Sequence, residues 1–307
     1  MLAFFLAAVL PALHWDQGPS TANAVKEAGV NRLYVPADQV AAWKNQGFDA
    51  EAFDAAKFVK VPAPGVEYKT DVAAATSLPW VNANGWRFAR GGSHTYYYVA
   101  PWRKAVLAAA EAFANGVDAA VHPDARDLAT FGKMLAFLQS IDAPPLPAMA
   151  NIGMVDDGSQ VTGEVMNLMA RRNLLFRVVR APDSTCDLNV QIGTEEFSKE
   201  AAANPFAFAT LVRKKLTDEK RLVRIYGSDV VLARMNGDAT RVRVHLINYG
   251  GSKVDGLRVR VRGEYAKGTL EAFGIQNAAL ADYAVAEGGT EFTVPSMNVY
   301  AVVDLKK

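Results

Sequence analysis

Short apolar runs alternate with helical patterns over the first two-thirds of the chain. In the clearest example, residues 148–155 are mostly apolar and predict a strand buried on both faces. Apolar residues then recur at helical spacing over residues 161–169, and a second buried strand is predicted over residues 174–179. The turn residues 156–159 offer an N-cap for the helix. A strand, a helix and a strand in this order indicate a parallel sheet.

The same alternation extends to both sides of this unit. Further strands are predicted over residues 30–35, 58–61, 95–99, 117–121 and 188–192. Further helices are predicted over residues 21–28, 39–45, 105–115, 128–141 and 205–216. The chain up to residue 224 is therefore predicted to be an α/β fold with mostly parallel strands.

The pattern changes after Arg221. Residues 241–246 and 257–262 alternate with period two, and glycine-rich turns separate them from other short apolar runs. Additional strands are predicted over residues 230–234, 291–294 and 299–305. The C-terminal part is therefore predicted to be an antiparallel β-sandwich. Arg258, Arg260 and Arg262 fall on one face of their strand, which we expect to be solvated.

Composition and charge exclude some partners. The 307 residues are half hydrophobic and carry a formal net charge of +1, so no electrostatic attraction to nucleic acid or to an anionic membrane is expected. Cys186 has no second cysteine with which to form a disulfide, and we expect a structural or surface thiol.

Two interpretations of residues 1–12 are open. This apolar run has the length of a signal peptide, although no Lys or Arg stands in front of it. As a signal peptide, it would make the protein secreted or periplasmic. Alternatively, it is a first buried strand that runs into Leu13, His14 and Trp15, and the protein is cytoplasmic.

Acidic residues at strand ends are the catalytic candidates. Ligands of α/β folds bind at the carboxyl ends of the strands, and glycoside hydrolysis generally needs two carboxylates that flank the bond. The candidates are Asp16, Asp124, Asp156 and Asp157. The alternative for Asp156 and Asp157 is that they only turn the chain and cap the following helix.

Aromatic and amide residues supply candidates for sugar binding. All five tryptophans lie between Trp15 and Trp102, which suits either a sugar cleft or one large core. The binding candidates are Trp15, Asn82, Asn84, Trp86, Arg87 and His122. A folded loop with satisfied amides, and a merely hydrogen-bonded histidine, are the alternatives. No metal-ligand spacing or phosphate loop occurs, so neither a metal nor another cofactor is predicted.

The order of these parts resembles a known family. The segment IGMVDDGSQVTGEVMNLMARRNLLFRVV, followed by HLINY at 245–249, TVP at 293–295 and YAV at 300–302, is similar to glycoside hydrolase-like proteins. Among these are the barrel β-galactosidases, in which a (β/α) barrel precedes a glutamine-amidotransferase-like, flavodoxin-like domain and a small β-sandwich. Those proteins trimerise through the middle domain, so the resemblance also allows a homo-oligomer.

Pattern and resemblance together divide the chain into four segments: a candidate signal peptide over residues 1–12, a barrel-like region over 13–142, a flavodoxin-like region over 143–224 and a β-sandwich over 225–307. Two departures stand out. The Asn-Glu pair of the retaining barrel hydrolases is missing, and residues 13–142 are too few for a full barrel of about 250 residues.

Pattern and resemblance together predict a carbohydrate-active, glycoside hydrolase-like protein that acts on or binds glycosides. The alternative is a non-catalytic sugar-binding or assembly protein that has lost the hydrolase active site. In both cases carbohydrate is the expected partner, and neither nucleic acid nor a membrane is expected.

Overall fold

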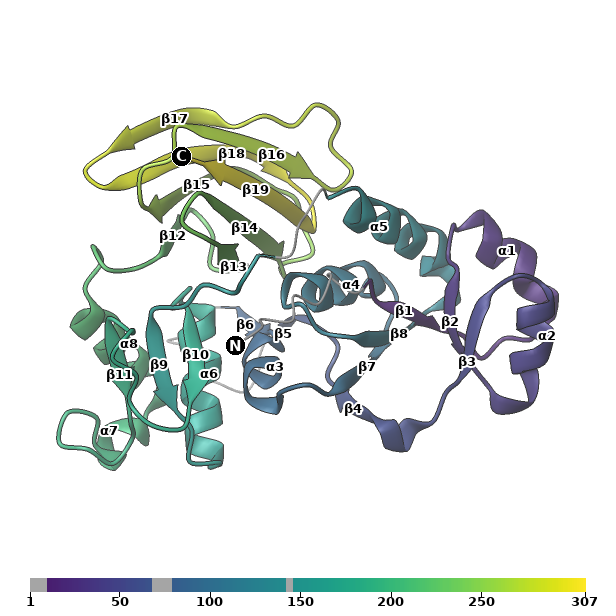
Figure 1. The fold of residues 1–307 in the computed structure, drawn as a ribbon, viewed down its shortest axis with the longest axis horizontal. Coiled ribbons are helices and arrows are strands. Elements are labelled where there is room, and N and C mark those ends of the chain that lie inside the picture. The colour runs from purple at the N-terminus through teal and green to yellow at the C-terminus, as the bar shows by residue number, and fades with distance from the viewer. Residues whose placement is uncertain (1–9, 68–78, 142–145) are drawn as a thin grey trace. The chain divides into compact units, whose positions relative to one another are not determined.

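The structure is a computed structural model that describes residues 10–67, 79–141 and 146–307. Most of the predicted signal peptide and the chain break expected near Asp142 lie outside these residues. The chain divides into two compact units (Figure 1). The first unit comprises Met1–Gly65 and Gly92–Pro145, and the second comprises Val66–Gly91 and Leu146–Lys307.

A six-stranded parallel sheet forms the centre of the first unit. Its order is β3-β2-β1-β8-β7-β4. The strands are β1 (Ala12–His14), β2 (Arg32–Val35), β3 (Asp49–Ala52), β4 (Phe58–Val61), β7 (Thr95–Ala100) and β8 (Ala119–Pro123). The helices are α1 (Ala22–Glu27), α2 (Val40–Asn45), α4 (Ala105–Ala114) and α5 (Leu128–Ser140). This confirms the predicted parallel sheet, and β1 is the short strand expected to run into Leu13 and His14.

Among the described residues, the strand order places the crossover helices of this sheet on one face. From β1 through β2 to β3, and from β4 through β7 to β8, the chain adds strands in the same direction. Because parallel crossovers are right-handed, steady progress in one direction places the helices on one face. α5 contacts both α4 and α1, as neighbours in one outer layer do. This is the winding of a barrel, and the opposite face carries Tyr34, Phe58 and Tyr97.

The second unit begins with a smaller parallel sheet. Its strands, in the order β10-β9-β11, are β9 (Ile152–Val155), β10 (Phe176–Val179) and β11 (Leu188–Val190). The helices α3 (Gly85–Gly91), α6 (Gln160–Arg171), α7 (Lys199–Ala202) and α8 (Pro205–Leu216) accompany it. Buried side chains such as Met154, Val165 and Phe208 form one core between sheet and helices. A two-stranded sheet, β5 (Gly65–Glu67) and β6 (Trp80–Asn82), precedes α3 along the chain.

The C-terminal part of the second unit is an antiparallel β-sandwich, as predicted. One sheet has the order β12 (Val223–Tyr226), β15 (Val254–Arg262), β18 (Gly289–Met297) and β17 (Ala281–Ala286). The other has the order β13 (Val231–Gly237), β14 (Arg241–Asn248), β19 (Tyr300–Lys306) and β16 (Lys267–Ala272). On β15, apolar residues point into the core between the two sheets and arginines point outward. Arg243 on β14 is instead buried and pairs with Asp304 at 2.7 Å.

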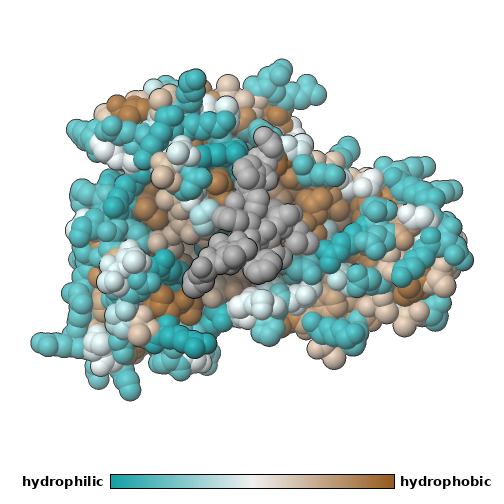
Figure 2. Space-filling model, in the orientation of Figure 1, coloured by the Kyte–Doolittle hydropathy of each residue, from teal (hydrophilic) through white to brown (hydrophobic). Residues whose placement is uncertain are grey.

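Hydrophilic side chains cover most of the visible face of the molecule, with smaller hydrophobic patches between them (Figure 2). Within the described part of the chain, no helix is both long and apolar enough to cross a lipid bilayer.

The contact between α5 and α1 gives a prediction about stability. A methyl group on Gly132 would lie 1.8 Å from the carbonyl oxygen of Ala28. In an open helix, Gly→Ala would stabilise by about 1 kcal/mol. We expect Gly132→Ala to lower the free energy of unfolding by about 1–3 kcal/mol, because two backbones must separate. Urea unfolding measures this change.

Gly18 is the matched control, because nothing lies within 4 Å of a methyl group placed there and its φ is −64°. We expect Gly18→Ala to change the free energy of unfolding by less than about 0.5 kcal/mol. A Gly132→Ala protein as stable as Gly18→Ala would contradict the close packing of α5 on α1.

Candidate functional site

Two histidines, a tyrosine and an aspartate meet at the carboxyl edge of the six-stranded sheet. His14 is the last residue of β1, and Asp16 follows two positions later. His122 lies near the end of β8, and Tyr97 lies on the adjacent strand β7. Parallel strands end at one edge, so residues far apart in sequence come together there. We call these four residues the His–Tyr–Asp cluster.

The Tyr97 hydroxyl connects the two imidazoles. It lies 3.1 Å from Nδ1 of His14 and 3.3 Å from Nδ1 of His122. Nε2 of His122 lies 3.5 Å from Oδ2 of Asp16. Four polar side chains, from three adjacent strands and the turn after β1, are therefore linked in one row.

The single hydroxyl proton of Tyr97 limits how this row can be hydrogen-bonded. Tyr97 donates to Nδ1 of one histidine and accepts from the Nδ1–H of the other. The Asp16 carboxylate lies beside Nε2 of His122 and can accept a proton from it, but cannot donate one when ionised. Tyr97 therefore couples the two imidazoles.

Aromatic rings border the cluster. The Phe53 ring stacks on His14 with centroids 3.9 Å apart and lies 4.7 Å from Tyr97. Phe58 is next in the stack, 4.9 Å from Phe53. These rings are half-buried, so they offer apolar surface beside polar groups that can hydrogen-bond.

Burial keeps His14 neutral. Burial first, and then the positive charge that His122 would carry, lower the pKa of His14 to about 4, although Asp16 acts in the opposite direction. Burial and the nearby Asp16 carboxylate raise the pKa of Tyr97. Both groups therefore act as neutral hydrogen-bonding partners near neutral pH.

Of the sequence candidates in the first unit, the structure brings Asp16 and His122 together. The side chain of Asp16 is 56% exposed, so it is accessible to a ligand. Trp15 is buried, and its Nε1 donates to Oγ1 of Thr21 at 2.9 Å. Trp15 is therefore a residue of the core.

Asp124 has a structural function at the end of β8. Its carboxylate accepts from the backbone and the guanidinium of Arg126, at distances from 2.7 to 3.0 Å, and caps the short 3₁₀ turn over Ala125–Asp127. These hydrogen bonds lower the pKa of Asp124 to about 2.

The remaining acidic candidates lie in the second unit, in the turn between β9 and α6. Asp156 accepts two hydrogen bonds from Arg90, at 2.8 and 2.9 Å. Asp157 accepts from the backbone N–H of Ser159, and hydrogen bonds from Ser159 and Thr162 lower its pKa to about 2. Ser159 itself caps α6, as the turn chemistry predicted.

The candidates between β6 and α3 also lie in the second unit. Asn84 is buried, and its Oδ1 accepts from Arg87 at 3.2 Å. The Arg87 guanidinium lies 4.3 Å from the centroid of the Trp86 ring. A methyl group on Gly163 of α6 would lie 2.7 Å from the Arg90 guanidinium and 3.0 Å from the Trp86 ring. Asn82 is half-buried at the end of β6. The roles of these residues, and of Asp156 and Asp157, stay predictions.

Sequence reasoning missed the tyrosine and the second histidine of the cluster. Tyr97 lies in the middle of a predicted strand, and His14 looked isolated in the sequence. The signal that could have found His14 is its position one residue before Trp15 and Asp16, at the end of the first strand. Among residues 10–67, 79–141 and 146–307, no three His, Cys, Asp or Glu side chains are arranged to hold a metal ion.

No protein-family model and no curated protein matches the chain. Among solved structures it is similar to α-L-fucosidase isoenzyme 2 from Paenibacillus thiaminolyticus, with 9% sequence identity, 72% of this chain and 62% of that chain covered, and a TM-score of 0.55. A rhamnosidase from Novosphingobium sp. PP1Y shares 10% identity over 69% of this chain and 31% of that chain, with a TM-score of 0.45.

A β-galactosidase from Rahnella sp. R3 shares 8% identity over 96% of this chain and 60% of that chain, with a TM-score of 0.40. The chain thus spans less than two thirds of the length of each of these three proteins. The comparison with the fucosidase shows that the two chains share a similar fold over 72% of this chain. Similarity at this level of identity concerns the fold alone.

The low pKa of His14 predicts how stability depends on pH. Its folded-state pKa of about 4 lies below the ordinary 6.5, so the unfolded chain takes up this proton first as the pH falls. Stability should therefore fall between about pH 6.5 and about pH 4, by at most about 1.4 kcal/mol per pH unit from this residue. Urea unfolding of the wild type and of His14→Gln measures the contribution.

His94 is the control, because it is exposed just before the amino end of β7. We expect His94→Gln to keep the pH dependence of the wild type and His14→Gln to lose part of it. The same pH dependence in all three proteins would contradict the burial of a neutral His14.

The Asp156–Arg90 pair predicts a cost in stability. Both side chains are mostly buried, 17% and 21% exposed, so Asp156→Asn leaves a guanidinium that has lost its charged partner. We expect the free energy of unfolding to fall by about 1–3 kcal/mol in a urea titration. The more exposed pair Asp183–Arg177 is the control, and Asp183→Asn should cost less than about 1 kcal/mol. Equal costs would show that the buried pair is no stronger than a surface pair.

Proposed function

We propose that the protein is carbohydrate-active and binds a glycoside at the His–Tyr–Asp cluster. The observation that carries this proposal is the row of polar contacts from Asp16 through His122 and Tyr97 to His14, beside the stacked Phe53 ring. It lies at the carboxyl edge of a parallel sheet with barrel winding, where such folds place their ligands. The glycoside hydrolase-like fold supports the same class of ligand.

The chemistry of the cluster suits a sugar. A sugar presents hydroxyl groups that both donate and accept hydrogen bonds, and it presents an apolar face of C–H groups. Asp16 and His122, which are 56% and 27% exposed, supply hydrogen-bonding groups to the hydroxyls. The half-buried Phe53 and Phe58 rings supply apolar surface for the C–H face. Tyr97 and the buried His14 hold the exposed pair in place.

Binding accounts for the geometry better than hydrolysis does. Hydrolysis generally uses two carboxylates at one bond. Asp124, Asp156 and Asp157 are engaged in caps and ion pairs, which leaves Asp16 as the carboxylate of the cluster. Hydrolysis is the second candidate function, favoured by the contact between Asp16 and His122, since a carboxylate that orients an imidazole is a common proton-transfer arrangement.

The finer parts of the resemblance belong to the same proposal. Residues 143–224 would correspond to the glutamine-amidotransferase-like middle domain, and the β9–α6–β10 unit supports this correspondence. The boundaries at residues 142 and 224, export through residues 1–12 and a homo-oligomer are proposed on the resemblance and the sequence pattern.

Calorimetric titration with neutral oligosaccharides, together with a panel of chromogenic glycosides, tests the function. We expect Asp16→Asn and His122→Gln each to weaken glycoside binding by about tenfold, because each removes a charge-assisted or oriented hydrogen bond worth about 1.5 kcal/mol. Asp49→Asn and His94→Gln are the controls, since both residues are exposed at the amino edge of the same sheet. They should leave binding unchanged.

Three outcomes would change the assignment. Equal losses in site and control variants would contradict a site at the carboxyl edge. Loss of hydrolysis in Asp156→Asn or Asp157→Asn, with none in Asp16→Asn, would move the site to the second unit. No binding or hydrolysis of any glycoside would overturn the proposed function.

A further inference from the structure

Four arginines line one pocket of about 250 Å³ in the second unit. Arg171 and Arg172 lie at the C-terminal end of α6, Arg213 lies on α8, and Arg221 precedes β12. We call this the arginine pocket. So many like charges around one small space require an explanation, because like charges repel.

Three of these guanidinium groups carry a buried nitrogen without a hydrogen-bond partner among the residues that the structure describes. They are Nη1 of Arg171, Nε of Arg172 and Nε of Arg221. Arg221 is only 9% exposed, so water reaches little of it. Buried polar groups are nearly always paired, and an unpaired donor on a charged group is especially costly.

Carboxylates do not balance the four positive charges. Asp218 accepts two hydrogen bonds from Arg213, at 3.1 and 3.0 Å, and a third from Arg221 at 3.3 Å. Asp229 also lines the pocket. Burial and, to a lesser extent, the charge of a neighbouring arginine lower the pKa of both Arg171 and Arg172, whereas Glu164 raises that of Arg171. Asp218, Asp229 and Glu164 are three carboxylates beside four arginines, so positive charge is still in excess.

Neutral contacts hold the guanidinium groups in place. Arg171 lies over the Trp80 ring at 4.3 Å, and Arg172 lies over the Phe206 ring at 4.3 Å. Arg221 donates to the backbone carbonyl of Arg172 at 3.0 Å, which helps to cap α6. These contacts orient the arginines without neutralising them, so the positive charges around the pocket are positioned before a ligand arrives.

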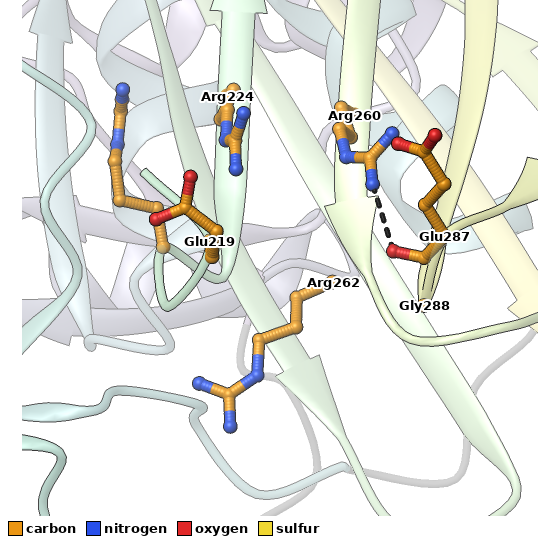
Figure 3. A pocket seen from close by; sticks show the side chains of 7 residues that line it. Glu219, Arg224, Arg260, Arg262, Glu287 and Gly288 are labelled. Carbon is orange, nitrogen blue, oxygen red and sulfur yellow. Dashed lines mark hydrogen bonds between the residues drawn. The ribbon is translucent and has the colours of Figure 1, made fainter. Parts of the chain in front are cut away.

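A neighbouring pocket of about 290 Å³ shows the contrast (Figure 3). Its charged lining residues are Glu219, Arg221, Arg224, Arg260, Arg262 and Glu287. Arg260 donates to Glu291 at 2.7 Å, and Arg262 donates to Asp187 at 2.5 Å. Arg262 also points away from Arg224 and Arg260. The charges of that pocket are largely matched within the protein, so it requires no ligand.

We propose that the arginine pocket binds the oxyanion of an acidic sugar, either the carboxylate of a hexuronate or the phosphate of a hexose phosphate. The planar guanidinium fork matches both groups. Tyr226, which is 43% exposed, lines the pocket and offers an aromatic surface for the sugar ring. Pockets for drug-sized ligands have volumes of about 300–1,000 Å³. The arginine pocket is smaller and suits a single sugar ring.

The sugar part of this ligand rests on the proposed carbohydrate function, whereas the oxyanion part rests on the pocket alone. Calorimetric titration of the full chain with galacturonate, galactose phosphate, inorganic phosphate and galactose separates the two. We expect at least one of the two acidic sugars to bind at least tenfold more tightly than either inorganic phosphate or galactose. Binding of inorganic phosphate as tight as that of both acidic sugars would overturn the sugar part, and no binding of any anion would overturn the site.

Arg171→Gln and Arg172→Gln test the residues. We expect each to weaken binding of the acidic sugar by about tenfold or more, because one charge-assisted hydrogen-bonded pair is lost. Arg177→Gln is the control, since Arg177 is in the same unit and is paired with Asp183. Unchanged affinity in both pocket variants would overturn the assignment.

A stability measurement separates binding from a purely structural role. Removing an uncompensated charge should leave the melting temperature of the ligand-free protein unchanged or raised in Arg172→Gln. The acidic sugar should raise the melting temperature of the wild type and of Arg177→Gln more than that of Arg172→Gln. A large loss of stability in ligand-free Arg172→Gln, with affinity retained, would show that the arginine is structural.

Discussion

The parallel pairing of the strands determines where the candidate side chains of the first unit lie. Parallel neighbours end at the same edge of the sheet, so His14 and Asp16 after β1 lie beside His122 on β8. Right-handed crossovers place the described crossover helices on one face of the sheet and leave the other for Tyr97 and Phe53. The row of polar side chains and the aromatic stack beside it both depend on this arrangement of the strands.

Local patterns predicted most of the fold. The helix over residues 205–216 agrees with α8 at both ends, because Asn204 caps it, Pro205 starts it and apolar residues recur along it. The outward arginines of β15 followed from period two alone. The sequence pattern missed elements whose residues are unusual for the secondary structure that they adopt. β17 was missed because its side chains are almost all exposed, and α3 was missed because glycines and aromatic residues do not look helical.

The candidate site could be predicted only in part, because its partners are far apart in sequence. Asp16 and His122 were found as polar residues at strand ends. Tyr97 could not be found in this way, because no local sequence pattern shows that β8 lies between β1 and β7 in the sheet. The charges of Asp124 and Asp156 were visible in the sequence, but Arg90 lies 66 positions before Asp156, and only tertiary packing shows that this carboxylate is already occupied.

The C-terminal end of α6 has a consequence for how the molecule responds to its surroundings. If the arginine pocket takes up an oxyanion as proposed, the stability of the folded chain depends on which anions the solvent contains. An anion present at a hundred times its dissociation constant adds about 2.7 kcal/mol to the free energy of unfolding. The choice of buffer anion would then be a variable of the folded state itself.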